Sequence, residues 1–388
     1  MKRIVLAYFN AGGGHRAAVR ALDDTIQDQR RPWITTLMDV DRVLESTDPL
    51  YRSTGVRGGE LYNWTLRRGW TAGSAQVIPI MHGVIRLLHT RQVKLLREQW
   101  RVLRPDLVVS VIPHLNRALY ESLRAEFPET PFVTLITDLA DYPPHFWFES
   151  QDQHFICGSD VAVEQARAAG IEERNIWQVS GMILHPRFYQ QMPGDRTEER
   201  RKLGLDPDMP AGLMLFGGFG SQSMVRIARR LALAKTRTQL IFLCGKNRPL
   251  FDQLNDLKFP FPVHVQGFTE HVAHYMWLSE FFIGKPGPGS VSEALAMGLP
   301  VIVEAGSKTL AQERYNVEWI MEQGVGLPVS HLKDFPQAVY SILKPGAYRA
   351  ITERIQGLRN RAVFEVPEVL EKILSQAEAA LPHQTLLG

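Results

Sequence analysis

The side chains best suited to chemistry lie in or beside three glycine-rich turns. The stretch GKPGPGSVSEALAMGLPVIV, residues 284–303, places Gly287 and Gly289 before a helix that carries Glu293 near its start. One interpretation is structural, because Ser290-x-x-Glu293 is a capping box that satisfies backbone donors at a helix start. The other is that the glycines let a ligand approach bare backbone while Glu293 accepts hydrogen bonds from its hydroxyls. The two are compatible, since one carboxylate oxygen can cap while the other binds.

A second turn lies in LMLFGGFGSQSMVRIARR, between an apolar run and a helical pattern. Gly217, Gly218 and Gly220 precede a helix that we expect to begin near Ser221. Free backbone N–H groups and the positive end of the helix dipole favour a phosphate at such a position. The turn therefore indicates a site for a phosphorylated ligand.

The third turn, in AYFNAGGGHRAAVRAL, carries His15. Gly12-x-Gly14-x-x-Ala17, with Asp39 ending the next strand, fits a dinucleotide fingerprint, so an NAD(P)- or flavin-dependent enzyme is a rival interpretation. An imidazole in the turn itself suits catalysis better than a tight pyrophosphate cradle. With an unperturbed pKa of about 6.5, neutral His15 can accept a proton near pH 7. Capping of the following helix is its structural alternative.

Short apolar, β-rich runs alternate with helical patterns along the chain, which predicts an α/β fold with parallel sheets. The 388 residues suffice for two cores. We predict two doubly wound Rossmann-like domains facing an interdomain cleft, 1–190 and 191–364, with a helix at about 365–388 packing back onto the first. Doubly wound sheets bind ligands at the carboxyl ends of their strands, where all three turns lie.

The composition points to a cytosolic globular protein. Cys157 and Cys244, the two cysteines, lie in apolar runs and are predicted to be reduced core residues. No window approaches the roughly 18 apolar residues of a membrane-spanning helix. We therefore expect a cytoplasmic protein that is soluble or peripheral on a membrane surface.

The net charge of +3 is unevenly distributed. Residues 51–104 hold ten Lys and Arg against Glu60 and Glu98, a local excess of +8, so the remainder of the chain carries −5. Aromatic residues interrupt this stretch, and such a segment can lie on anionic lipid headgroups. The alternative is a solvated helix face, and nucleic acid is not expected because no binding motif accompanies the charge. The membrane contacts we predict are Trp64, Arg67, Arg68 and Trp70.

The motifs GGGHRAA, GGFGSQ, VQGF, GKPGPGSVSEALAMGLPVIV and LAQERYN occur in this order along the chain. Together they resemble the GT-B glycosyltransferases of family 28. This group includes the monogalactosyldiacylglycerol synthases and the peptidoglycan N-acetylglucosaminyltransferase, and GGGHRA and GKPGPG look closer to the first. The similarity spans nearly the whole chain and is poorest between about 40 and 105.

The resemblance implies an inverting hexosyltransferase that moves a sugar from a UDP-sugar to a lipid hydroxyl, such as diacylglycerol or a glycolipid, without a metal or other cofactor. The uracil would lie against Phe268, the ribose hydroxyls would bind Glu293, and the sugar hydroxyls would bind Gln312 and Glu313. The complete predicted donor site comprises Gly218, Gly220, Ser221, Phe268, Gly287, Gly289, Ser290, Glu293, Gln312 and Glu313.

The predicted acceptor side is in the first domain. His15 matches the histidine of the family's N-terminal loop and is the first candidate base, with Asp138 the second. Gly13, Gly14 and Trp147 complete the acceptor side. The family often has an arginine where this chain has His185, so a cationic contact at that position is not expected.

Several alternatives stay open at this stage. A transferase for a soluble acceptor is the nearest, followed by a sugar-nucleotide epimerase of the same fold, an NAD(P)-dependent enzyme and a non-catalytic binding module. Asp39-Val-Asp41 resembles the metal-binding motif of another glycosyltransferase architecture, but it ends a strand in the acceptor half and is interpreted as a turn. The expected location is the inner face of the cell membrane, and the sugar and the oligomeric state are left open.

Overall fold

The computed structural model describes residues 1–9, 13–47, 74–142, 145–306 and 309–380, without the side chains of 74–81. These residues form two compact units, which we describe one at a time. The first comprises 1–47, 75–185 and 361–380, and the second comprises 186–360. The corresponding boundaries predicted from the sequence were 190 and 364.

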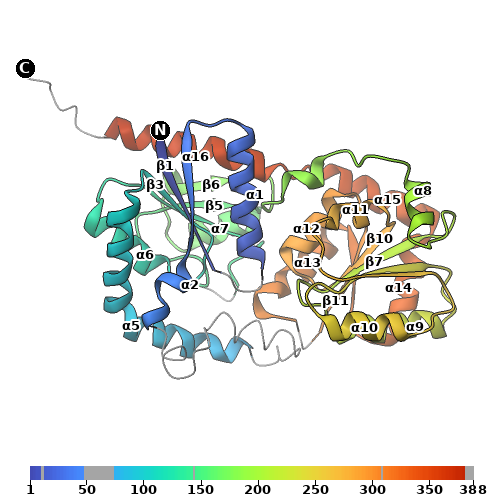
Figure 1. Cartoon of the computed structure of the whole chain (residues 1–388). Coiled ribbons are helices and arrows are strands. Elements are labelled where there is room, and N and C mark those ends of the chain that lie inside the picture. Colours follow the sequence, from blue (N-terminus) through green and yellow to red (C-terminus); the bar gives the residue numbers. More distant parts are fainter. Residues whose placement is uncertain (10–12, 48–73, 143–144, 307–308, 381–388) are drawn as a thin grey trace, which may run out of the picture. The chain divides into compact units, whose positions relative to one another are not determined.

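The first unit contains a six-stranded parallel sheet of order β2-β1-β3-β4-β5-β6 (Figure 1). Its central strands are buried on both faces: Ile4, Val5 and Leu6 of β1 are consecutive and almost fully buried. This explains why they read as an unbroken apolar run instead of an alternating one. The strands are β1 (Lys2–Tyr8), β2 (Trp33–Asp39), β3 (Leu107–Ser110), β4 (Phe132–Leu135), β5 (His154–Cys157) and β6 (Ile176–Gln178).

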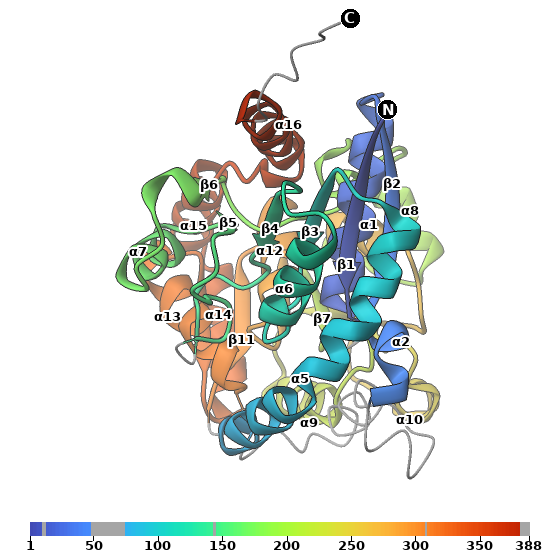
Figure 2. The same cartoon turned by 90° about the vertical axis from the view of Figure 1, so that its left-hand side faces the viewer.

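Helices cover both faces of this sheet. On one face, α1 (Gly14–Asp28) and α16 (Ala362–Ala380) share a core with β1 and β3 that includes Leu22 and Leu370. On the other, α5 (Ser74–Leu103) and α6 (Asn116–Glu126) lie side by side (Figure 2). The remaining helical elements are α2 (Val40–Val43), η1 (Glu45–Thr47), α7 (Asp160–Ala168) and η2 (Glu173–Asn175). The C-terminal helix thus contributes to the core of the first unit.

The second unit repeats the architecture with a parallel sheet of order β12-β11-β10-β7-β8-β9 (Figure 1). Its strands are β7 (Ala211–Leu215), β8 (Gln239–Leu243), β9 (Val263–Gln266), β10 (Phe281–Gly284), β11 (Val301–Glu304) and β12 (Gly326–Val329). The sequence did not predict β12, which contains Pro328. Proline cannot donate to the ladder and is confined to edge strands, and β12 is such an edge.

The helices of the second unit alternate with its strands. They are α8 (Arg196–Lys202), α9 (Gln222–Leu233), α10 (Arg248–Asp256), α11 (Val272–Trp277), α12 (Pro288–Ala296), α13 (Arg314–Gln323), α14 (Phe335–Leu343) and α15 (Pro345–Gly357). Three short 3₁₀ turns accompany them, η3 (Pro186–Tyr189), η4 (Ala311–Glu313) and η5 (Leu332–Asp334). The predicted GT-B class, two doubly wound α/β units, is confirmed.

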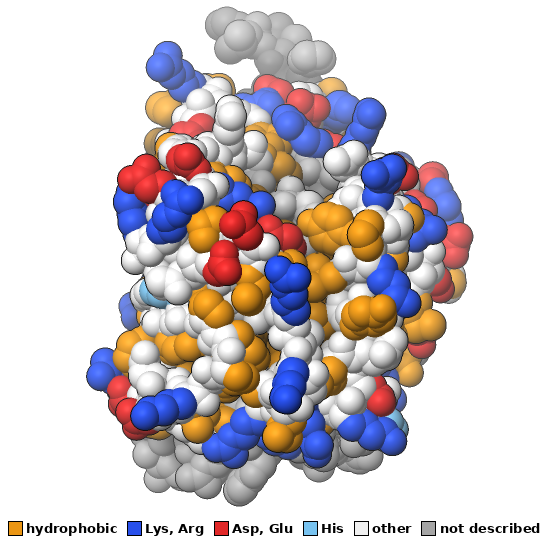
Figure 3. Space-filling model, turned by 90° about the vertical axis from the view of Figure 1, so that its right-hand side faces the viewer, with side chains coloured by type: hydrophobic (Ala, Val, Ile, Leu, Met, Phe, Trp, Pro, Cys, Tyr) orange, Lys and Arg blue, Asp and Glu red, His pale blue; other side chains and the backbone are white. Residues whose placement is uncertain are grey.

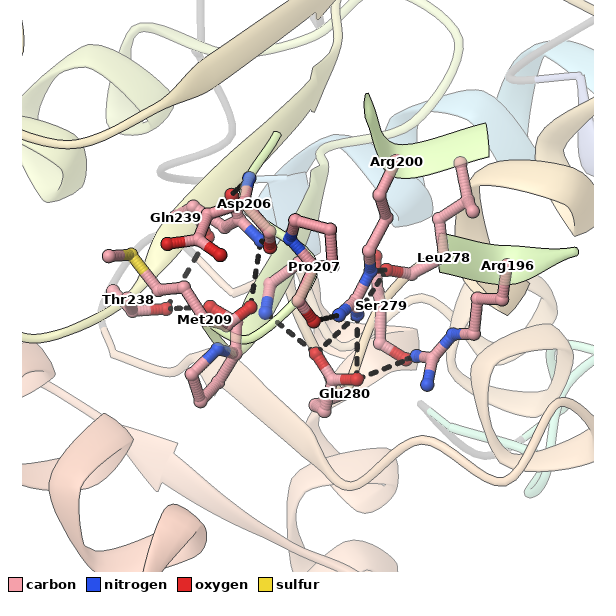
Figure 4. Close-up of polar contacts among 12 residues, drawn as sticks. Arg196, Arg200, Asp206, Pro207, Met209, Thr238, Gln239, Leu278, Ser279 and Glu280 are labelled. Atoms are coloured by element: carbon pink, nitrogen blue, oxygen red, sulfur yellow. Dashed lines mark hydrogen bonds and ion pairs between the residues drawn. The ribbon is translucent and has the colours of Figure 1, made fainter. Parts of the chain in front are cut away.

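A buried ion-pair network fastens the polar segment before β7 to the amino-terminal ends of the strands (Figure 4). The Arg200 guanidinium donates to the carbonyl oxygens of Leu278 (2.7 Å) and Pro207 (3.0 Å) and to the Glu280 carboxylate (2.6 Å). Arg196 pairs with the same carboxylate at 2.7 Å. This segment is therefore an integral part of the second unit, away from the carboxyl ends of its strands.

Arg200→Ala is expected to lower the free energy of unfolding by about 2–3 kcal/mol, because it leaves buried carbonyl acceptors without a donor while Arg196 still neutralises Glu280. Urea unfolding followed by tryptophan fluorescence measures this. Arg201→Ala, the exposed neighbour, is the matched control and should change stability by less than about 0.5 kcal/mol. Equal losses in the two variants would contradict the role assigned to the network.

Candidate functional site

In the second unit, the turn between β7 and α9 is shaped by glycines with left-handed backbone. Gly220 has φ 58°, and a Cβ there would lie 2.6 Å from Leu250 Cδ2. Gly245, with φ 57°, approaches the turn so closely that a Cβ would lie 2.2 Å from the Gly218 carbonyl oxygen. Gly218 itself faces open space. The Ser221 hydroxyl caps α9 by accepting from Ser223 N at 3.1 Å. Backbone can therefore meet a ligand at Gly218, next to a helix start.

The turn between β10 and α12 leaves the same edge of the sheet, because β10 and β7 are neighbouring parallel strands with Gly284 beside Leu215. The helix begins at Pro288 with Gly287 as its N-cap and without a capping side chain. The capping-box interpretation of Ser290 and Glu293 is therefore wrong, since the helix starts before Ser290. Gly289 is exposed and a Cβ there would meet nothing.

Glu293 is a partly buried carboxylate on α12. Burial raises its pKa to about 7, although the Arg187 guanidinium acts in the opposite direction. Among the residues that the structure describes, the Glu293 carboxylate has no hydrogen-bond or ion-pair partner. A carboxylate that lost hydration without gaining a donor is suited to receive donors from a ligand.

A pocket of about 360 Å³ lies at the carboxyl end of β9. Phe268 is 58% exposed, and the Lys246 ammonium lies 5.2 Å from the ring centroid. The lining comprises Gly245, Lys246, Arg248, Phe251, Gln266, Gly267 and Phe268. An exposed aromatic face beside hydrogen-bonding groups can hold a planar heterocycle.

Gln312 and Glu313, predicted to bind sugar hydroxyls, lie in η4. Gln312 is partly buried, whereas Glu313 is buried and accepts a charged hydrogen bond from Lys285 Nζ at 2.5 Å. The sequence did not predict this pair, because its members are 28 residues apart.

In the first unit, His15 lies in the first turn of α1. The N-cap is Gly13, with φ 88°, so His15 does not cap the helix. Its Nδ1 lies 3.3 Å from Thr137 Oγ1, and its ring centroid lies 6.2 Å from that of Trp147. Burial lowers the pKa of His15 to about 4, which keeps the imidazole neutral at pH 7. Gly14, the first residue of α1, is exposed with open space around it.

Asp138 and Trp147 belong to the same cluster as His15. The buried Asp138 carboxylate accepts a hydrogen bond from Trp147 Nε1 at 2.9 Å. Asp141 accepts from the backbone nitrogens of His145 (2.8 Å) and Trp147 (2.6 Å). The loop after β4 is thus held so that Trp147 lies against His15, which unites the two candidate bases and the predicted acceptor tryptophan.

Sequence reasoning missed a histidine pair in this cluster. His114 follows β3 with φ 74°, and its Nδ1 lies 2.6 Å from His82 Nε2 of α5. Its ring packs edge-on against Phe146 with centroids 4.0 Å apart. Burial, with smaller contributions from His82 and His15, lowers the pKa of His114 to about 3. The sequence feature that could have revealed His114 is its position directly after a buried strand, in VVSVIPH.

The basic stretch is only partly described. Trp64, Arg67, Arg68 and Trp70 lie outside the described residues. Trp100, one of the aromatic residues in this stretch, is fully buried and donates to Ser122 Oγ at 2.8 Å, so it belongs to the core and does not face a membrane. Arg97 and Arg101 both pair with Glu126 of α6. On the described part of α5, exposed Leu87 lies between the exposed Arg86 and Arg91.

Two further features bear on the predicted site. His185 Nε2 lies 3.0 Å from Asp24 Oδ2 within the first unit. Asp39 ends β2 as predicted, but its side chain does not cap the following helix. Within the described ranges, the side chains form no cluster of three or more potential metal ligands, and none of the helices is long and apolar enough to cross a bilayer.

The neutral state of His15 can be measured directly. Its imidazole should titrate in an NMR experiment near pH 4 instead of 6.5, because burial lowers its pKa. The signal is assigned by its absence in His15→Gln. Because the folded pKa lies below the unfolded one, this histidine's contribution to stability is complete above pH 6.5 and is lost as the pH falls toward 4. A midpoint near 6.5 would contradict a buried neutral base.

Two doubly wound α/β units, each with a glycine turn that leads from a strand into a helix, have the architecture of the GT-B fold. Residues 213–330 match the model of the glycosyltransferase family 28 C-terminal domain. This segment therefore carries a family 28 C-terminal domain, and the predicted resemblance to family 28 and the predicted enzyme class are confirmed.

Curated relatives and solved structures agree with this assignment. The chloroplastic monogalactosyldiacylglycerol synthase of Spinacia oleracea is 27% identical over 97% of this chain and 73% of its own length. Monogalactosyldiacylglycerol synthase 1 of Arabidopsis thaliana is 29% identical over 84% of this chain and 62% of its own.

Two solved structures share the fold. S. aureus MnaA, solved with UDP, has a TM-score of 0.62 at 13% identity and covers 97% of both chains. Acinetobacter baumannii MurG has a TM-score of 0.57 at 13% identity, covering 96% of this chain and all of its own.

Proposed function

We propose that this enzyme transfers a hexose from a UDP-sugar to a lipid hydroxyl, such as that of diacylglycerol, with inversion at the sugar carbon. The observation that carries the donor half is the Glu293 carboxylate, which accepts no hydrogen bond from the described residues and lies on the helix after one of two glycine turns that leave neighbouring strands. A ribose offers two hydroxyl donors to such a carboxylate, and a diphosphate fits N–H groups at helix starts. The UDP in the MnaA structure and the names of the synthase relatives support the choice of nucleotide and acceptor.

The second unit binds the donor in this proposal. The uracil stacks on the exposed face of Phe268, the ribose binds Glu293, and the diphosphate lies at Gly218 and Gly289. Serine hydroxyls at the two helix starts, Ser221 and Ser290, add donors. Preorganised N–H groups stabilise the departing diphosphate, so we propose that no metal is required. Addition of EDTA to the purified enzyme should then leave the rate unchanged.

The first unit supplies the base. Neutral His15 accepts the proton of the acceptor hydroxyl as that oxygen attacks the anomeric carbon, and the bond from the sugar to the diphosphate breaks. Trp147, held by Asp138, forms an apolar wall beside the imidazole. The Thr137 hydroxyl lies 3.3 Å from Nδ1 and the ring also has a hydrogen bond with the Val111 backbone, so two neighbours fix its orientation.

The experiment that tests this function offers radiolabelled UDP-galactose, UDP-glucose, UDP-N-acetylglucosamine and UDP-glucuronic acid, each with diacylglycerol in mixed vesicles. The expected product is a labelled glycolipid from one donor, with the anomer inverted as judged by NMR. Label in a water-soluble glycoside would instead select a soluble acceptor. Conversion of the UDP-sugar in the absence of an acceptor would indicate an epimerase. Binding of NAD(P)H without binding of UDP would rule out the proposed transferase.

We further propose that the enzyme works as a peripheral protein on an anionic membrane surface, at the cytoplasmic side of the cell membrane. The basic excess of residues 51–104 supports this, as do the exposed Arg86, Leu87 and Arg91 of α5. On the face drawn in Figure 3, by contrast, acidic side chains lie among the basic and apolar ones. Flotation with phosphatidylglycerol vesicles should show binding that high salt reverses. Equal binding to neutral vesicles would show that the basic side chains do not direct the enzyme to anionic lipid.

A further inference from the structure

Lys285 lies between the two glycine turns of the second unit. A Cβ placed on Gly217 would lie 3.5 Å from Lys285 Cε, and one placed on Gly287 would lie 3.2 Å from the same atom. The lysine stem therefore passes between turns that leave neighbouring strands β7 and β10. The φ of Gly287 is an ordinary −73°, so a side chain there would not strain the backbone but would require the lysine to shift by a few tenths of an ångström.

A buried carboxylate holds the ammonium at this position. Glu313 Oε1 lies 2.5 Å from Lys285 Nζ, and the side chains are 7% and 37% exposed, respectively. The lysine is thus anchored on its buried side while part of its surface stays accessible. An ammonium has three donors, so it can bind a second acceptor without leaving Glu313.

We propose that Lys285 is a catalytic residue that contacts the donor diphosphate and stabilises the charge that develops on UDP as the sugar leaves. The inference rests on the proposed function and deepens it. Each helix start supplies only about half an elementary charge, whereas the ammonium supplies a full one. Its attraction for the diphosphate increases as the sugar–phosphate bond breaks, which lowers the barrier and not only the dissociation constant.

Glu313 acts as the positioning residue in this arrangement. It keeps the site close to neutral before the donor binds and holds the ammonium between the turns. Three other cations of the second unit have different neighbours: Lys246 lies over the Phe268 ring, Arg200 lies in the network around Glu280, and Arg187 acts on Glu293. Gln312, next in the chain, stays available for the sugar hydroxyls.

Isothermal titration calorimetry with UDP and with uridine tests the proposal, because the two ligands differ only in the diphosphate. Lys285→Gln should weaken UDP binding about 10- to 100-fold, the range for charge-assisted hydrogen bonds, and leave uridine binding unchanged. Glu313→Gln should bind UDP at least as tightly as the wild type, since it removes a competing carboxylate. Lys333→Gln, an exposed lysine of the same unit, is the matched control and should behave as wild type.

Lys285→Gln leaves Glu313 buried without its counter-ion, so the double variant Lys285→Gln/Glu313→Gln protects the test against misfolding. It should also lose UDP affinity while keeping uridine affinity. UDP affinity in both variants within about twofold of the wild type, against the tenfold or larger loss expected, would overturn the proposal. An equal loss of UDP and uridine would also overturn it. Failure of the wild-type enzyme to bind UDP would instead overturn the proposed donor, and this result is distinguishable from the failure of the Lys285 proposal.

Discussion

His15→Ala is expected to lower kcat about 10²- to 10⁴-fold, the usual contribution of a positioned general base. The affinity for UDP should not change, because His15 belongs to the first unit and the proposed nucleotide residues belong to the second. Single-turnover transfer to diacylglycerol with labelled donor measures the chemical step, and calorimetry measures UDP binding. His15→Gln, which keeps a polar side chain of similar size but cannot accept the proton at neutral pH, should lose as much activity.

The control is His331→Ala, an exposed histidine outside the proposed site, which should keep wild-type activity. Thermal unfolding separates a catalytic from a structural role, because loss of the ring removes its hydrogen bonds with the Thr137 hydroxyl and the Val111 backbone. Loss of activity together with a large fall in Tm would assign His15 to structure. Activity above about a tenth of wild type would remove it as the base.

Asp138→Asn distinguishes the two candidate bases within the same assay. The amide oxygen of asparagine can still accept from Trp147 Nε1, so the position of the tryptophan is retained. If His15 is the base, this variant should keep most of its kcat. A loss as large as that of His15→Ala would transfer the role to Asp138.

Glu293→Ala is expected to weaken UDP binding about 100- to 1000-fold, because two hydrogen bonds from ribose hydroxyls to a carboxylate are lost. Stability should not fall. The pKa of Glu293 is raised to about 7 by burial, so its ionisation costs folding free energy as the pH rises through that value. Above pH 7 the variant should therefore be at least as stable as wild type in thermal unfolding.

The matched control is Glu322→Ala, at an exposed carboxylate of α13, which should change neither the affinity for UDP nor the thermal stability. Calorimetry with UDP and with uridine should show the same proportional loss in Glu293→Ala, because both ligands carry the ribose. A loss confined to UDP would place the ribose elsewhere. Equal losses of stability and affinity would return Glu293 to a purely structural role.

The order and class of the elements could be read from the chain because that information is local. Buried parallel strands need unbroken apolar runs, as in RIVLAYF and TQLIFLCG, and the polar pattern between them marks the helices. The turns at Gly218, Gly289 and His15 could be found for the same reason, since a strand, a glycine turn and a helix are consecutive in sequence. The edge strand β12 was not predicted because Pro328 interrupts its apolar pattern.

Other features depend on which strands and helices become neighbours. Lys285 meets Glu313, and His82 meets His114, across separations of 28 and 32 residues. Trp100 is in the core because α6 packs beside α5, although its sequence context indicated an interfacial residue. The sequence by itself determined an α/β glycosyltransferase with glycine turns at its strand ends. The tertiary structure decided which charges face those turns, because packing brings distant side chains together in a way that no short stretch of sequence encodes.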